Sequence, residues 1–159
     1  MKAALRLSIV VAVFVSLVSW GSGSSSALAD DGQRVITFTK WITTFPQMAG
    51  FVGGAAVGAF AGEVLTLQNT TNPQVTSITR LVAIYDIQAG PHSFTALVQG
   101  GQNNQTDRAL LDGVILGGWF TGARVQVEYQ VKTDCAGAPA GTCFQGTIRI
   151  EPEAHDVED

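Results

Sequence analysis

Apolar and polar residues alternate along much of the chain after residue 30. The clearest case is segment 123–131, where the odd positions are Ala, Val or Tyr and the even positions are Arg, Gln or Glu. Successive side chains of a strand point to opposite faces, so this alternation predicts a strand with one buried face and one wet face. Segment 79–87, TRLVAIYDI, is apolar on nearly both faces and predicts a strand that is covered on both sides.

Similar segments follow at short intervals, and turn-forming residues separate them. The expected strands are 35–43, 62–68, 79–87, 92–100, 123–131 and 146–152, while the short apolar segment 109–115 fits either a strand or a helical turn. The stretch with Pro46 and the glycines of GFVGG is expected to be a loop, and the polar runs 69–74 and 101–107 to be turns. Because no helical pattern alternates with the strands, we predict an all-β fold. The predicted architecture is a single antiparallel barrel of about eight strands, and a β-sandwich is the alternative.

The pattern G-x-F-x-G occurs at 58–62 and again at 118–122, each time just before an alternating segment. A weaker copy is CFQGTIRI at 143–150. Glycine tolerates bends and close backbone approach, so the motif predicts places where a curved sheet turns, with Phe60 and Phe120 pointing into the core. A phosphate-binding loop would need a helix after the glycines, and strands follow here instead.

Two longer stretches, AIYDIQAGPHSFTALVQG at 83–100 and GGWFTGARVQVEYQV at 117–131, resemble the small eight-stranded barrels of the allene oxide cyclase and dirigent-like group. The resemblance covers about 58–150 and consists of a rhythm of glycines and strands. The group's usual G-G-[ST]-G-x-F run is present here only as Gly117-Gly118-Trp119-Phe120. The resemblance implies a barrel with a hydrophobic cavity, often oligomeric, that acts without metal or cofactor. No catalytic position of the cyclases can be matched to this chain.

The N-terminus has the features of a signal peptide. Basic residues precede the apolar run LSIVVAVFVSLV, and Ala27-Leu28-Ala29 fits an A-x-A cleavage site. The run is shorter than the roughly 20 residues that a membrane span needs. We therefore expect a signal peptide over 1–29, a β-barrel domain over 30–152 and an acidic disordered tail over 153–159. The protein would be secreted or periplasmic, with no membrane attachment after cleavage.

Cleavage of the expected signal peptide removes two of the nine basic residues and none of the thirteen acidic residues. The remaining chain has a net charge of about −6. No basic stripe remains, so nucleic acid is not an expected partner. Cys135 and Cys143 bracket the turn-forming run AGAPAGT, and a disulfide between them would stabilise by about 2–3 kcal/mol. Two cysteines without nearby histidine do not make a zinc site, so neither a metal nor a cofactor is expected.

The candidate catalytic residues are Glu63, Asp86 and Arg124. By strand parity Glu63 and Asp86 both share a face with apolar neighbours, so at least one of them is expected to face the interior near a rim. One interpretation is a structural carboxylate–arginine pair, and the other is a general acid or base with a raised pKa. Lys40 also lies on an apolar strip, and its ammonium group is expected to snorkel out of it.

Aromatic residues are the candidate ligand-binding set, although the same residues could simply form the core. They are Phe60, Tyr85, Phe94, Trp119, Phe120 and Tyr129. His92 follows Gly90-Pro91 and is expected at an exposed turn. The function expected first is an exported barrel that binds a small apolar molecule or a partner without chemistry. The alternatives are a cofactor-free isomerase or cyclase-like enzyme and a structural extracellular protein, and a homo-oligomer is a further expectation from the resemblance.

Overall fold

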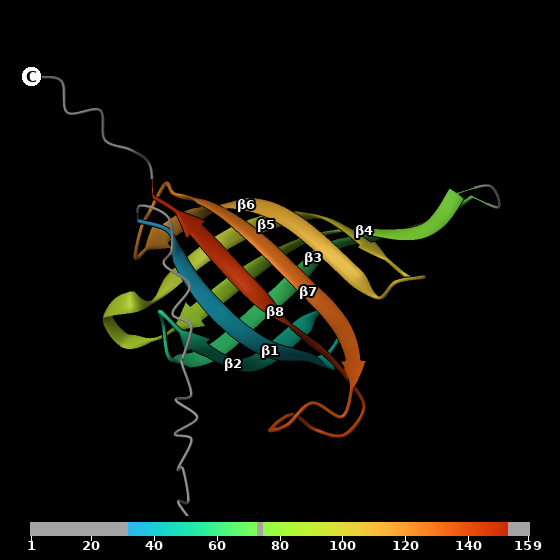
Figure 1. Cartoon of the computed structure of the whole chain (residues 1–159), viewed down its shortest axis with the longest axis horizontal. Coiled ribbons are helices and arrows are strands. Elements are labelled where there is room, and N and C mark those ends of the chain that lie inside the picture. Colours follow the sequence, from blue (N-terminus) through green and yellow to red (C-terminus); the bar gives the residue numbers. More distant parts are fainter. Residues whose placement is uncertain (1–31, 73–74, 153–159) are drawn as a thin grey trace, which may run out of the picture.

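The computed structural model describes residues 32–72 and 75–152, so the expected signal peptide and acidic tail lie outside the described residues. Eight antiparallel strands close into one barrel (Figure 1). The strands are β1 Arg34–Thr44, β2 Gln47–Gly54, β3 Gly58–Asn72, β4 Val75–Gln88, β5 Phe94–Asn103, β6 Arg108–Gly118, β7 Arg124–Thr133 and β8 Thr142–Glu151. The all-β barrel prediction is confirmed, and the sandwich alternative is not what forms.

Each strand pairs with the next one along the chain, and β8 pairs back onto β1 to close the barrel. Closure leaves the barrel without the unpaired strand edges that favour aggregation, except where one strand outruns its neighbour. The β3–β4 hairpin does so, because the pairing of β2 with β3 stops at Glu63 while β3 continues to Asn72. This hairpin projects beyond the other strands in Figure 1.

The prediction of a loop around residues 47–54 is wrong, because this stretch forms strand β2, in which Met48 and Val52 are buried. Its glycines are what made it resemble a loop. Gly50 lies opposite Lys40 of β1 and Phe60 of β3, and a Cβ atom there would come within 2.1 Å of the Thr39 carbonyl oxygen. The glycine is therefore needed for strands to approach closely inside a tightly curved sheet.

Other boundaries also differ from those expected. Residues 69–72 belong to β3 and 101–103 to β5, so the two polar runs are partly strand. Segment 109–115 is part of strand β6. Residues 90–92 form a 3-10 turn, η1 Gly90–His92, and His92 is exposed there as expected.

Alternating residues of every strand fill the barrel. In β4 the odd positions from Leu81 to Ile87 are buried, whereas Val82 and Ile84 remain partly exposed. The prediction that this strand is covered on both sides is wrong, because a single-layer barrel has its core on the inside only.

The barrel has two different ends. At one end, called here the Trp119 end, the ring of Trp119 lies 4.4 Å from that of His92 and 4.6 Å from that of Phe120. Buried Ala56 and Phe94 belong to the same end. At the other end, called here the Ile42 end, β1 finishes and Ile42 is 39 % exposed.

The two Phe residues of the repeated motif have different roles. Phe60 lies near the start of β3 and is buried in the core, as predicted. Phe120 is only half-buried and packs against the end of the core, in a turn where it adopts a positive φ of 58°. Gly122 has a φ of 90°, with no neighbouring atom within 4 Å of a Cβ built on it. Glycine is thus favoured at 122 by the backbone conformation rather than by crowding.

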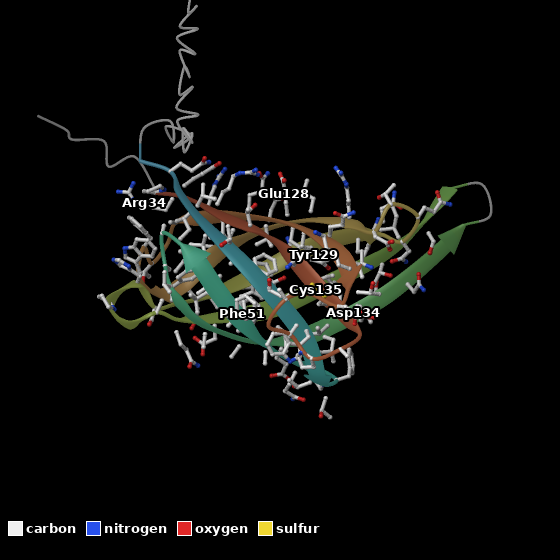
Figure 2. All side chains as sticks on the ribbon, turned by 60° about the horizontal axis from the view of Figure 1, so that its bottom comes forward. Arg34, Phe51, Glu128, Tyr129, Asp134 and Cys135 are labelled. Atoms are coloured by element: carbon white, nitrogen blue, oxygen red, sulfur yellow. A yellow bond between two sulfur atoms is a disulfide. The ribbon has the colours of Figure 1, made fainter. Side chains whose placement is uncertain are left out.

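The predicted disulfide joins Cys135 and Cys143, whose Cα atoms are 6.1 Å apart. It closes the loop between β7 and β8. That loop returns to the outer face of β2, where a Cβ on Gly137 would lie 3.2 Å from the Phe51 ring. Figure 2 labels both Cys135 and Phe51. A disulfide is compatible with an oxidising compartment. Among the described residues, no helix is long and apolar enough to cross a membrane.

Candidate functional site

Lys40 projects from β1 into the barrel interior. It shares the inner face of that strand with Ile36 and Phe38, and only 3 % of its surface is exposed. Among residues 32–69 and 77–152 it is the only buried charged side chain. The expectation that Lys40 snorkels to water is wrong, because the strip it lies on faces the inside of a closed barrel rather than an accessible sheet face.

Aromatic rings surround the amine. The Nζ atom donates a hydrogen bond to the hydroxyl of Tyr85 on β4. It lies 4.2 Å from the centroid of the Tyr85 ring and 4.8 Å from that of Tyr129. Three more ring centroids are 5.6–5.7 Å away, those of Phe38, Phe60 and Phe144. These distances are within the range of cation–π contacts.

The amine has no acidic partner, since no carboxylate of the described residues lies within ion-pair distance of Lys40. Burial lowers the pKa of Lys40 to about 7, because removal from water disfavours the ammonium form. The ring faces act in the opposite direction, since they attract the cation. Burial also raises the pKa of Tyr85 well above its usual value and raises that of Tyr129. Both phenols therefore stay protonated at neutral pH, next to an amine that exchanges its proton there.

Glycines allow the strands around this group of rings to approach closely. Gly146 of β8 lies between Phe38 and Tyr129 on the neighbouring strands. A Cβ on Gly146 would be 1.9 Å from the Glu128 carbonyl oxygen, so the strands could not approach as closely with any other residue. Gly50 takes the equivalent place beside Lys40 on β2. The two glycines therefore allow β2 to pack closely against β1, and β8 against β7, beside the rings.

A chain of polar side chains runs from the group of rings toward the Ile42 end. The Tyr129 hydroxyl donates to Gln102 Oε1 at 3.1 Å, and Gln102 Nε2 donates to Asn104 Oδ1 at 3.0 Å. Asn104 Nδ2 in turn donates to Thr79 Oγ1 at 2.9 Å and to Ser77 Oγ at 3.2 Å. This end of the interior is therefore lined partly by hydrogen-bonding groups, in contrast to the aromatic Trp119 end.

The predicted carboxylates lie elsewhere. Glu63 is exposed on β3, and Asp86 is on the outer face of β4, where it accepts hydrogen bonds from Thr95 Oγ1 at 3.3 Å and Gln88 Nε2 at 3.1 Å. Arg124 is exposed on β7. The expectation that Glu63 or Asp86 faces the interior is wrong. Apolar residues also occupy the outer faces of β3 and β4. Sharing a strand face with apolar residues therefore did not show that a carboxylate faces the barrel interior.

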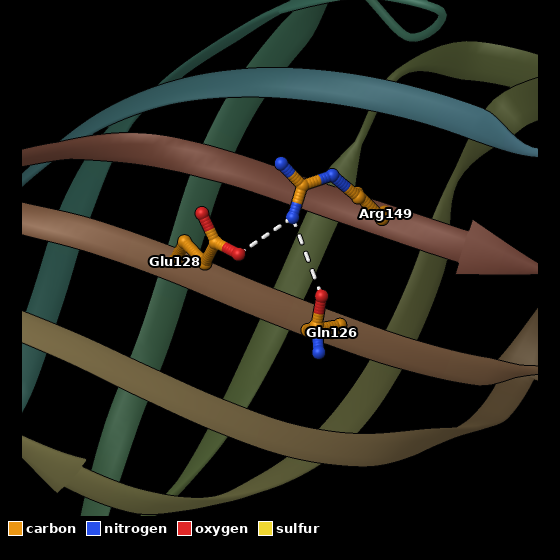
Figure 3. A network of polar contacts seen from close by, with 3 residues as sticks. All are labelled: Gln126, Glu128 and Arg149. Carbon is orange, nitrogen blue, oxygen red and sulfur yellow. Dashed lines mark hydrogen bonds and ion pairs between the residues drawn. The ribbon is translucent and has the colours of Figure 1, made fainter. Parts of the chain in front are cut away.

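The ion pair that does form lies on the outer surface. Arg149 Nη1 contacts Glu128 Oε1 at 2.7 Å and donates to Gln126 Oε1 at 3.3 Å (Figure 3). It joins β8 to β7, and both charged side chains are partly exposed. Such pairs contribute up to about 1 kcal/mol, so this one has a modest structural role.

The six aromatic candidates fall into two groups. Phe60, Tyr85 and Tyr129 surround Lys40, whereas Phe94, Trp119 and Phe120 belong to the Trp119 end. Sequence reasoning missed the importance of Lys40 itself. The available signal was its shared parity with Ile36 and Phe38, which places a lysine on a face that a barrel closes off.

Among the described residues, no group of three or more histidine, cysteine, aspartate or glutamate side chains could hold a metal ion. Comparisons of the chain with protein-family models, with curated proteins and with solved structures found no match.

Proposed function

We propose that this protein is an exported β-barrel that binds a small apolar molecule, without cofactor, and that Lys40 receives the polar end of that molecule. The observation that carries the proposal is a buried amine within 6 Å of five aromatic ring centroids, with no carboxylate of the described residues to pair with it. A buried charge without a partner costs stability, so its position favours a role toward a ligand.

The chemistry of the group of rings defines the ligand class. Ring faces favour a flat or apolar body, and the Lys40 amine with the Tyr85 hydroxyl favours an oxygen acceptor at one end. A ligand oxygen would accept a further hydrogen bond from the ammonium group, which has three donors and only the Tyr85 oxygen as an acceptor. The ligand would enter from the Ile42 end, where the inner faces of the strands are partly exposed.

The proposed export rests on the signal-peptide features of residues 1–29 and is supported by the disulfide. A relation to allene oxide cyclase-like barrels also stays a proposal, and the eight-stranded closed barrel supports it. Self-association is a further proposal, supported by Leu110 and Leu116 on the outer face of β6, each about half-exposed. Light scattering of the purified protein measures its mass in solution and tests this point.

Benzoate is a suitable probe because it combines one aromatic ring with an anionic oxygen group. Lys40 and Lys132 are the only lysines after residue 29, so isotope-labelled lysine gives two signals from the mature protein. Titration with benzoate should shift the side-chain signal of Lys40 saturably and leave that of exposed Lys132 unchanged.

Lys40→Met should weaken benzoate binding by about tenfold or more, because a charge-assisted hydrogen bond is lost. Lys132→Met is the matched control and should bind as the unsubstituted protein does. Equal weakening in both variants, or no saturable response of Lys40, would contradict the proposal. Native mass spectrometry of protein purified from its own host adds an independent measurement, the mass of any retained ligand.

A further inference from the structure

Lys40 combines three features that a carbonyl-binding amine requires. It is a primary amine, it is enclosed by apolar ring faces, and it has a hydroxyl group at hydrogen-bonding distance on Tyr85. From this geometry we propose that the barrel takes aldehydes or ketones and binds them as a reversible imine on Lys40. The inference rests on the proposed function, since it names the polar group of the ligand.

Imine formation balances without any other reactant. The Nζ lone pair attacks the carbonyl carbon, and the displaced π electrons take up a proton on oxygen to give a carbinolamine. Loss of the hydroxyl group with one nitrogen proton releases one water molecule and leaves the C=N bond. No oxidation or reduction occurs, so no cofactor is needed. The reverse reaction needs only the return of that water.

The surroundings of Lys40 assist each step. Attack requires the neutral amine, and burial favours that form without a carboxylate to hold the proton. The Tyr85 hydroxyl remains protonated and is placed to donate its proton to the carbonyl oxygen as charge develops there. The apolar rings exclude water, which protects the C=N bond once it has formed.

The interior also restricts which carbonyl compounds can react. The side chains of Tyr85 and Phe60 meet edge to face with centroids 4.9 Å apart, and Phe38 and Phe60 stack at 5.8 Å. Such walls favour a compact ring or a flat chain over a branched or charged body. Gly50 and Gly146 let neighbouring backbone pack closely beside Lys40, so a ligand body has to be accommodated by shifts of the rings.

Reductive trapping tests the inference on the mature protein with its disulfide intact. The protein is incubated with benzaldehyde and sodium cyanoborohydride at pH 7, and peptide mass mapping locates the benzyl group. Lys40 should be labelled at least about tenfold faster than exposed Lys132, because the buried amine is far less protonated than an ordinary lysine with a pKa of about 10.4. Preferential labelling of Lys132 or of the chain terminus would overturn the inference.

Tyr85→Phe separates the role of the hydroxyl from that of the rings. This variant keeps the amine and the aromatic ring but loses one of the two groups proposed to contact the ligand oxygen. Benzoate should therefore bind at Lys40 more weakly but still saturably, and Lys40 should be trapped more slowly at saturating benzaldehyde and with a changed pH profile. Equal trapping rates and pH profiles would show that Tyr85 takes no part in proton transfer.

The two benzene derivatives distinguish failure of the inference from failure of the proposed function. If benzoate binds at Lys40 but benzaldehyde is never trapped there, the barrel is a binding protein and the imine is refuted. If neither compound reaches Lys40, the proposed function fails with it. Near-ultraviolet circular dichroism of each variant verifies that the barrel has folded. A variant that is misfolded is thereby distinguished from one that folds but does not react.

Discussion

The amine of Lys40 and the hydroxyl of Tyr85 form a hydrogen bond across the barrel interior, between β1 and β4, which are separated in the sheet by β2 and β3. The bond therefore links opposite parts of the wall rather than neighbouring strands. Both groups are buried, and the phenol of Tyr129 is the other titratable group that faces the amine. The protonation of Lys40 is thus tied to the folded state.

The free energy of unfolding should rise with pH between about 7 and 9. The pKa of Lys40 is about 7 in the folded protein and 10.5 in the unfolded chain. Below pH 7 both states carry the proton, and the folded state bears the full cost of the buried cation. Between the two pKa values the unfolded chain binds more protons, so stability increases with pH, by up to about 1.4 kcal/mol per pH unit.

Urea unfolding at several pH values measures this slope, and the variant Lys40→Met with Tyr85→Phe should lack it. The pH range stops at 9 because Tyr85 and Tyr129, whose pKa values are raised by burial, reduce stability at higher pH. A slope that is the same in both proteins would show that groups other than Lys40 cause it.

The same double variant should be more stable than the unsubstituted protein at pH 6.5, by about 1 kcal/mol or more. Apolar residues of similar size in place of a buried polar pair remove a desolvation cost. Removing Tyr85's hydroxyl together with the amine avoids an unsatisfied buried donor. Thermal unfolding measures the change. A clear loss of stability would mean that Lys40 is held in place for structural reasons.

Gly146→Ala should lower the free energy of unfolding by more than about 2 kcal/mol. The added Cβ would lie 1.9 Å from the Glu128 carbonyl oxygen and 2.7 Å from the Tyr129 Cα, so the β7–β8 pairing would have to open. Gly117→Ala is the matched control, because Gly117 is equally half-buried in a strand and has no neighbour within 4 Å of its Cβ position. Similar melting temperatures for the two variants would contradict the role assigned to Gly146.

Cys135→Ala with Cys143→Ala should lower stability by about 2–3 kcal/mol, because the disulfide limits the unfolded chain. Intact mass before and after alkylation, without reductant, establishes whether the bond is present in exported protein. Benzoate binding should persist in this variant, since neither cysteine contacts Lys40. Full alkylation without reductant would show that the bond does not form.

Strand alternation was enough to predict the all-β barrel and the two hairpins around β4 and β7, because period-two burial is a local property of the sequence. It failed for β2, where Gly50, Gly53 and Gly54 weaken every strand signal. Gly50 and Gly54 are required by how closely the backbone of β1 approaches β2, which only the folded sheet reveals.

The site was only partly predictable for a similar reason. Parity placed Lys40 and Tyr85 on apolar faces, but it could not tell which face of each strand becomes the interior. For β1 the apolar face was the inner one, while Glu63 and Asp86 share their faces with apolar residues that remain on the outside. In β3 a register shift between Val64 and Thr66 further separates Glu63 from Leu65 and Leu67, its apolar neighbours of the same parity.

Among the strands of the described residues, only β1 and β8 pair while lying far apart in the sequence, and Lys40 lies directly opposite Phe144 in that pairing. All other pairs of strands can form as hairpins between consecutive segments, which are quick to close. The pairing of β1 with β8 forms only when the two ends of the domain come together. Until this pairing forms, we expect the amine to have water on one side and to react as an ordinary lysine does. Its reactivity would then appear late in folding, when the last ladder closes, so the kinetics of labelling at Lys40 would report the moment at which the barrel is complete.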